Sequence, residues 1–270
     1  FAQPSAESKQ AENMKNLVPG YYQRVRAGKG EDWIKVYINS EYGFVKEGRP
    51  VYPEYVDSVH CKRFDTIPQL PIRVGLDFGL WPSAIFAQRK QNGQWRWRSE
   101  ICGDEIGVYR FAEEIRRHLS DNYQGMKVMQ LTGDPAGDAR SPTDKNERST
   151  FQILSALGIN ASPATTNDFV KRREAVARPL TRMIDGEPGL LIHPDCAIAR
   201  KGMAGGYAYR RIRVSDSERY ENKPNKNKYS HPCDAGQYLH LGGGEWSDMI
   251  KQPDQPYKTE EYGQAVSGVM

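Results

Sequence analysis

Apolar and polar residues alternate along three short stretches between positions 72 and 102. They read IRVGLDFG, SAIFAQRK and WRWRSEIC, separated by the turn signals LWP and QNGQ, and predict three strands. Phe111, Ile115 and Leu119 follow at helical spacing. A fourth strand is predicted in KVMQLTGDPAG, where it closes on a glycine-bounded loop.

The second half of the chain predicts mainly helices. STFQILSALGI and NDFVKRREAVARPLTRMIDG are helical, with Ser149 and Asn167 as expected N-caps. A short strand, GLLIHP, precedes a basic hairpin with a long polar tip, and SHPCDAGQYLHLGGG predicts a last helix ended by glycines. This order predicts an α/β fold, with a mixed sheet of five or more strands and helices on both faces. It is typical of ribonuclease H-like domains.

Shifts in composition divide the chain into three parts. Residues 1–70 read as a leader, ending in a proline-broken extended segment suited to a strap over another surface. Residues 71–243 carry the strand and helix pattern, and residues 244–270 form a polar tail without a core pattern. The chain begins with Phe1 rather than Met, so we expect a fragment or a processed product.

The overall charge is only mildly basic, but it is unevenly distributed. The net charge is +4, and Lys and Arg concentrate between Lys171 and Lys228, which suits an acidic partner on one face. A solvated surface is the simpler interpretation. The four cysteines form no CxxC pair, which favours a reducing compartment. No apolar run is long enough to span a membrane.

Three aspartates end core elements and are the candidate chemistry of the chain. Asp77 ends the first predicted strand, Asp134 ends the fourth, and Asp234 lies in the first turn of the last helix. Singly, each has a local interpretation as a turn or helix-end residue. If the two strands are neighbours, however, all three carboxylates meet at one edge of the sheet. Clustered carboxylates repel one another unless a cation lies between them, and hard divalent ions prefer such oxygen ligands.

These motifs resemble a known family. RVGLDFG, LTGDPAG and NKYSHPCDAGQYLHLG, in this order and behind the leader GRPVYPEYVDSVH, look like the nuclease domain of the large terminase subunit of tailed bacteriophages. The resemblance implies a metal-dependent endonuclease that cuts concatemeric double-stranded DNA during viral genome packaging. It also implies that Asp77, Asp134 and Asp234 are catalytic and bind two Mg²⁺ or Mn²⁺ ions.

The same resemblance implies several partners and a location. The expected partners are double-stranded DNA, the ATPase motor domain of the same full-length protein, the portal and the small terminase subunit. The expected location is the host cytoplasm, transiently at the procapsid portal, with no membrane association. No GxxxxGK[ST] loop occurs in this sequence, so we expect the motor to be absent from it.

Basic residues of two segments are the candidate DNA contacts. Phosphate contacts would supply affinity without sequence preference, and Lys228 is the candidate nearest the metals. His231, three residues before Asp234, either positions that acid or contacts the helix start. The candidate set is Lys171, Arg172, Arg173, Arg210, Arg211, Arg213 and Lys228.

Three other functions remain open at this stage. An actin-like or sugar-kinase-like ATPase also opens with a strand, D-x-G and a turn, although the chain is short for its two halves. A recombinase of the same fold is chemically closer, but such enzymes usually carry Glu where Asp234 stands. A non-catalytic module that docks to the packaging motor would not need three converging acids.

Overall fold

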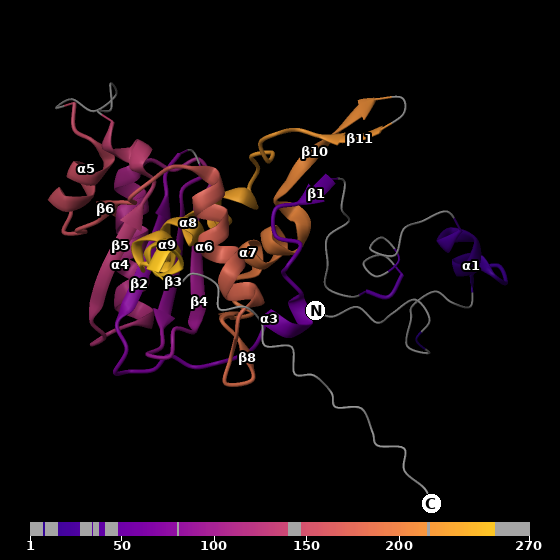
Figure 1. Cartoon of the computed structure of the whole chain (residues 1–270), viewed down its shortest axis with the longest axis horizontal. Coiled ribbons are helices and arrows are strands. Elements are labelled where there is room, and N and C mark those ends of the chain that lie inside the picture. Colours follow the sequence, from indigo (N-terminus) through magenta and orange to yellow (C-terminus); the bar gives the residue numbers. More distant parts are fainter. Residues whose placement is uncertain are drawn as a thin grey trace, which may run out of the picture.

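The central element of the computed structural model is a mixed sheet covered by helices on both faces (Figure 1). The structure describes Ser8, Ile34 and the ranges 16–27, 38–40, 48–79, 81–139, 147–214 and 217–251. Within these, the helices are α1 (Tyr21–Arg26), α3 (Asp57–His60), α4 (Val108–Asn122), α5 (Thr150–Ala156), α6 (Phe169–Thr181), α7 (Ala197–Lys201), α8 (Ser230–Gly242) and α9 (Glu245–Lys251).

Six strands form the central sheet, in the order β6-β5-β2-β3-β4-β9. The β2–β3 and β3–β4 pairs are antiparallel, whereas β5 runs parallel to both β2 and β6, and β9 runs parallel to β4. The predicted mixed α/β sheet, five-stranded or longer, is confirmed. The strands are β2 (Ile72–Asp77), β3 (Ser83–Arg89), β4 (Trp95–Cys102), β5 (Val128–Gly133), β6 (Ser162–Pro163) and β9 (Leu190–Ile192).

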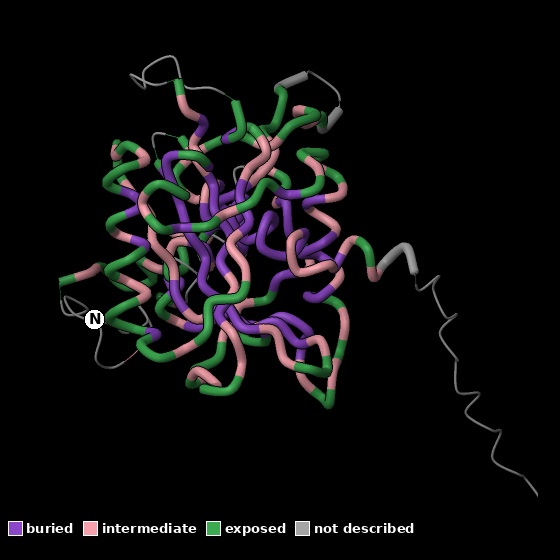
Figure 2. The backbone as a smooth tube through the Cα atoms, turned by 90° about the vertical axis from the view of Figure 1, so that its left-hand side faces the viewer, coloured by how far each residue is buried: buried purple, intermediate pink, exposed green. Residues whose placement is uncertain are grey.

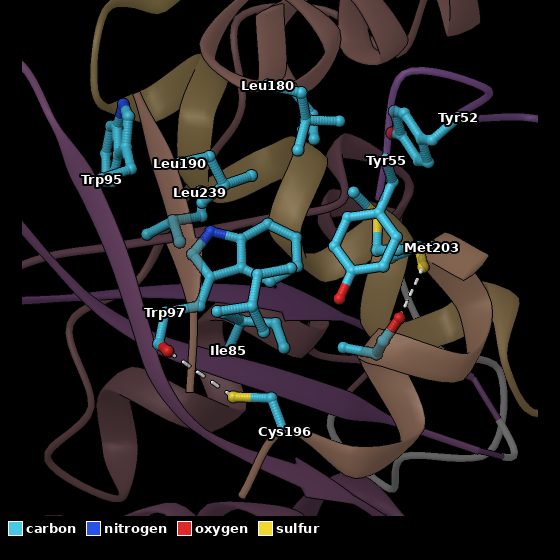
Figure 3. Packing of buried hydrophobic residues seen from close by; sticks show 14 of the residues in the cluster. Tyr52, Tyr55, Ile85, Trp95, Trp97, Leu180, Leu190, Cys196, Met203 and Leu239 are labelled. Carbon is cyan, nitrogen blue, oxygen red and sulfur yellow. Dashed lines mark hydrogen bonds between the residues drawn. The ribbon is translucent and has the colours of Figure 1, made fainter. Parts of the chain in front are cut away.

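One face of the sheet packs against α6, α8 and the segment 48–60, which we call the strap. Trp95 and Trp97 are fully buried there, as expected for core side chains. Figure 3 shows Trp97 among side chains from these elements, with Tyr55 and Met203 close by. Cys196 Sγ lies 3.8 Å from the carbonyl oxygen of Trp97. This face therefore joins segments from both ends of the chain into one core.

The other face packs against α4 and α5. Val74 and Leu76 of β2 meet Phe111 and Ile115 of α4, at the spacing that predicted this helix. Helix α5 begins at a capping box on Ser149, which confirms that cap. The buried residues, which include most of the central strands and of α8, lie inside a shell of more exposed segments (Figure 2).

A smaller sheet holds the strap and the hairpin together. Its order is β1-β10-β11, and the antiparallel hairpin extends away from the main body (Figure 1). A two-stranded sheet pairs β7 with β8. The strands are β1 (Gly48–Pro50), β10 (Ala208–Val214), β11 (Ser217–Tyr220), β7 (Met183–Ile184) and β8 (Glu187–Pro188). The predicted basic hairpin is therefore present.

Residues beyond both expected boundaries, before residue 71 and after residue 243, also pack into the main core. Val51, Tyr52 and Tyr55 of the leader lie in the main core, because bulky apolar residues flank its prolines. The expected tail begins with α9, where the fully buried carboxylate of Glu245 accepts a 2.8 Å hydrogen bond from the indole of Trp95. The remainder of that tail, 252–270, lies outside the described residues.

Within the part of the chain that the structure describes, no helix combines the length and apolarity that crossing a membrane would require.

Candidate active site

Asp77 and Asp134 lie side by side at one edge of the central sheet. Asp77 is the last residue of β2, and Asp134 directly follows β5. The two strands are parallel, with Leu76 opposite Gly133, and the amide of Asp134 donates a 3.2 Å hydrogen bond to the carbonyl of Leu76. The condition for the two acids to share an edge, that these strands are neighbours, is therefore met.

Helix α8 brings Asp234 to the same edge. Residues 73, 75 and 77 share one face of β2 because strand side chains alternate, and this face lies under α8. A Cβ on Gly75 would lie 2.0 Å from the carbonyl oxygen of Ala235. The absence of a side chain at Gly75 thus lets the helix backbone approach the strand, with Asp234 close to Asp77.

Asp77 is buried and held by a histidine. The residue is 4% exposed, and its Oδ2 lies 2.8 Å from Nδ1 of His231. The pKa of Asp77 is raised to about 6, mainly by burial; the negative charge of Asp234 adds to this rise, whereas the His231 hydrogen bond and Lys226 oppose it. His231 therefore contacts Asp77, rather than the acid that it precedes in sequence.

Asp234 is completely buried and surrounded by donors. The hydroxyl of Tyr207 donates a 3.0 Å hydrogen bond to its Oδ1, and Arg172 lies 3.5 Å from the same oxygen. The ammonium of Lys226 pairs with Oδ2. A buried carboxylate is costly unless it is paired and hydrogen-bonded, and these three groups meet that requirement.

Asp134 is half-buried and is fixed by an amide side chain. Its Oδ1 accepts hydrogen bonds from Nδ2 of Asn167 at 3.0 Å and from the backbone of the second residue after it at 2.9 Å. Asn167 Oδ1 in turn accepts a 3.0 Å hydrogen bond from Tyr238. Burial raises the pKa of Tyr238, and the negative charges of Asp134, Asp77 and Asp234 raise it further. The three acids are therefore close enough to Tyr238 for their charges to act on its hydroxyl.

Solved structures share this arrangement of sheet and helices. The large terminase of a thermophilic bacteriophage gives a TM-score of 0.53 at 17% identity over 83% of this chain and 51% of that chain. The complex of the same phage protein with ATP-gamma-S gives 0.54 at 18% identity, over 84% and 53%. The P22 large terminase nuclease domain gives 0.50 at 9% identity, over 73% of this chain and 93% of that domain.

The chain has the fold of a large-terminase nuclease domain. This ribonuclease H-like fold is the one predicted from the sequence. The chain spans about half the length of the thermophilic-phage terminase but corresponds to nearly the whole P22 domain. No protein-family model and no curated protein sequence matches it.

The chemistry of the acid set in this nuclease fold fits a hard divalent cation. Asp77, Asp134 and Asp234 offer only oxygen ligands, the kind that Mg²⁺ and Mn²⁺ prefer. Among the described residues, however, no three acidic, histidine or cysteine side chains converge on one point as a ready metal cage. Oδ2 of Asp77 and Oδ2 of Asp234 are already paired with His231 and Lys226, so an ion bound by these oxygens would compete with those partners.

The two predicted arginines of α6 are buried or half-buried and bind other parts of the protein, rather than lying on an exposed face. Arg172 is 6% exposed and donates a 2.9 Å hydrogen bond to the Tyr238 hydroxyl, so it lies in the core rather than on the surface. Arg173 is half-buried, pairs with Glu54, and donates to a carbonyl of the strap, so it holds the strap. Lys171 lies over the ring of Trp246 at 5.6 Å. Close packing of α6 against α8 and the strap explains the positions of the two arginines.

The predicted hairpin residues are more accessible. Arg210 and Arg211 are exposed on β10, and Lys228 is exposed with its ammonium 5.2 Å from the ring of Tyr229. The backbone of Arg213 belongs to β10, while its side chain lies outside the described atoms. Of the two predicted sets of basic residues, the set on the hairpin is therefore the more exposed.

Two further side chains lie at the site where the sequence pattern does not place them. Lys226, two residues before the expected Lys228, reaches Asp234. Asn167, expected as an N-cap, instead joins Asp134 to the Tyr238 hydroxyl, while the next residue caps α6 through its carboxylate. The lysine-rich stretch before α8 indicated the segment, but not which of its lysines pairs with Asp234.

Proposed function

We propose that the chain is the nuclease part of a viral DNA-packaging terminase, a metal-dependent endonuclease that cuts concatemeric double-stranded DNA. One observation carries this proposal. Asp77 and Asp134 end neighbouring parallel strands, and α8 carries Asp234 to the same edge of the sheet, in a fold shared with terminase nuclease domains. Acids without a functional reason are rarely gathered this way, because their mutual repulsion costs stability.

Two Mg²⁺ or Mn²⁺ ions are the cofactors that these acids suit. Asp77 and Asp134 would hold the ions, and Asp234 would complete the second position. Divalent ions in such a pair activate water and stabilise the leaving oxygen during phosphodiester hydrolysis. The oxygen-only donor set supports this assignment.

The surrounding side chains position the acids. His231 holds Oδ2 of Asp77, Asn167 holds Oδ1 of Asp134, and Tyr207 donates to the third acid. Fixed carboxylates lower the cost of arranging a phosphate for in-line attack. These neighbours therefore act as positioning residues.

Double-stranded DNA would lie across the exposed arginines of the hairpin, which supply contacts to phosphates. The ATPase motor domain of a longer protein, the portal and the small terminase subunit are the other partners that this role requires. The thermophilic-phage terminase was solved with ATP-gamma-S, which supports a motor in proteins of this fold. Such a complex works in the host cytoplasm, at the procapsid portal.

Cleavage of supercoiled plasmid tests the proposal. The chain should nick and linearise plasmid slowly with Mn²⁺ or Mg²⁺, stop in EDTA, and be unaffected by ATP. Replacing any of the three acids by Asn should abolish cleavage, whereas Asp138→Asn provides the control, because Asp138 is exposed on the nearby 3-10 turn. Cleavage that survives EDTA, or an active variant at one of the three acids, contradicts the assigned chemistry.

A further inference from the structure

One carboxylate of the acid site has two counterions of different character. The guanidinium of Arg172 approaches Asp234 from inside the core, with a side chain only 8% exposed. Lys226 pairs with the other oxygen of Asp234, but its side chain is 55% exposed. Arg172 is thus enclosed by the fold, whereas Lys226 reaches the same acid from the solvent side.

The backbone around Lys226 is fixed, so only its side chain is free to move. The amide of Asn225 donates to the carbonyl of Ala208 at 2.9 Å. Asn227 bonds through Nδ2 to the carbonyl of Gly206 at 2.9 Å and through its amide to Ser230 Oγ at 3.0 Å. These bonds tie both neighbours of the lysine to the base of the hairpin and to the start of α8.

The ammonium of Lys226 occupies the oxygen that a divalent ion would need. Asp234 Oδ1 already accepts from Tyr207 and faces Arg172, which leaves Oδ2 as the oxygen on the solvent side. An ammonium and a divalent cation cannot share one carboxylate oxygen without strong repulsion. A metal ligated by Oδ2 of Asp234 therefore competes with Lys226 for that oxygen.

We propose that Lys226 is an exchangeable counterion of the site, which neutralises Asp234 in the metal-free protein and competes with divalent cations for it. This inference rests on the proposed function, since it concerns the same acids. When displaced, the lysine remains on its fixed backbone at the mouth of the site, where it can pair with a DNA phosphate. Metal entry is thereby coupled to the appearance of a phosphate contact.

Isothermal titration of the whole chain with MnCl₂, without DNA, tests the proposal by binding rather than by activity. Lys226→Met keeps the apolar stem and removes the charge, so Mn²⁺ should bind at least about fivefold more tightly than in the wild type. This factor is the low end of typical coupling between two ligands, because a half-exposed ion pair is partly screened. Lys226→Arg, which retains the competing charge, should not show the gain.

Lys223→Met is the matched control, because it removes an equal charge from an exposed side chain three residues before Lys226. It should leave Mn²⁺ affinity within about twofold of the wild type, the scale expected of a screened surface charge. An unchanged or weaker affinity in Lys226→Met, with normal binding by the wild type, refutes the competition and makes the ion pair structural. Equal gains in both Met variants also refute it, since that result reflects only net charge.

The outcome also separates this inference from the proposed function. If neither the wild type nor Lys226→Met binds Mn²⁺, the metal-dependent function fails and the inference fails with it. Binding by Lys226→Met alone supports the competition but counts against the proposed function, because a wild-type site that takes no ion could not support Mn²⁺-dependent cleavage.

Discussion

Asp77→Asn should stabilise the metal-free protein at neutral pH, even though it removes a proposed catalytic group. The pKa of Asp77 lies at about 6, above its ordinary 3.8, mainly because the carboxylate is buried. A tenfold change in proton affinity corresponds to about 1.4 kcal/mol. Ionising this side chain at pH 7 therefore costs the fold about 3 kcal/mol, an upper limit on what Asn can recover.

The sign of the effect depends on pH. A carboxyl group whose pKa is raised by folding favours the folded state fully below about pH 4, and this contribution is lost as pH rises through about 6. The wild type should accordingly lose stability relative to Asp77→Asn between about pH 4 and about pH 7. The variant can keep one hydrogen bond to His231, since an amide still offers an oxygen.

Differential scanning fluorimetry in EDTA, from about pH 4 to about pH 7.5, measures this difference. For a chain of this size, about 3 kcal/mol corresponds to a Tm increase of roughly 6 to 12 °C at pH 7, shrinking toward zero near pH 4. Asp138→Asn is the control, since the residue is exposed. A Tm difference that does not change with pH, or that favours the wild type at pH 7, refutes the reasoning.

Three further perturbations test the packing and the surface. Gly75→Ala should cost at least about 3 kcal/mol, because its Cβ would meet the Ala235 carbonyl at 2.0 Å; urea denaturation measures the loss. Arg172→Met should destabilise the fold by about 3 kcal/mol, since it removes a buried partner of Asp234, with Lys171→Met as the control in the same assay. Replacing the basic residues of the hairpin by Gln should weaken DNA binding equally across sequences. The slope of log K against log salt concentration should become shallower by about one unit per lost phosphate contact, as measured by fluorescence anisotropy at several salt concentrations. An unchanged slope would assign the hairpin to a protein partner. The hairpin substitutions are at Arg210, Arg211, Arg213 and Lys228.

Local patterns were sufficient for the sheet and for the positions of two acids. Strand alternation and the turn residues between strands mark β2, β3 and β4, and the same periodicity places Asp77 on the face that α8 covers. Adjacent parallel strands end at the same edge, so Asp134 follows from the fold. These inferences need only the chain order and the period of a strand.

Contacts between distant segments could not be predicted in this way. Tyr52 and Tyr55 lie in a proline-broken segment with no strand or helix pattern, and they enter the core because bulky apolar side chains fill space beside α6 and α8. The burial of Arg172 has the same cause. Its helix carries several cations, and only the packing of α6 on α8 decides which of them faces inward.

The charge balance of the site links its stability to its proposed chemistry. A fully buried Asp234 needs cations in order to fold, yet a nuclease needs the same carboxylate available to an ion. Arg172 is enclosed in the core, and moving it away would leave Asp234 buried without this cation, at a cost in stability. It is therefore suited to be a permanent partner of Asp234. Lys226 pairs with the same acid from a half-exposed side chain on an anchored backbone, so it can leave cheaply. Two counterions of unequal burial thus let one acid satisfy both requirements.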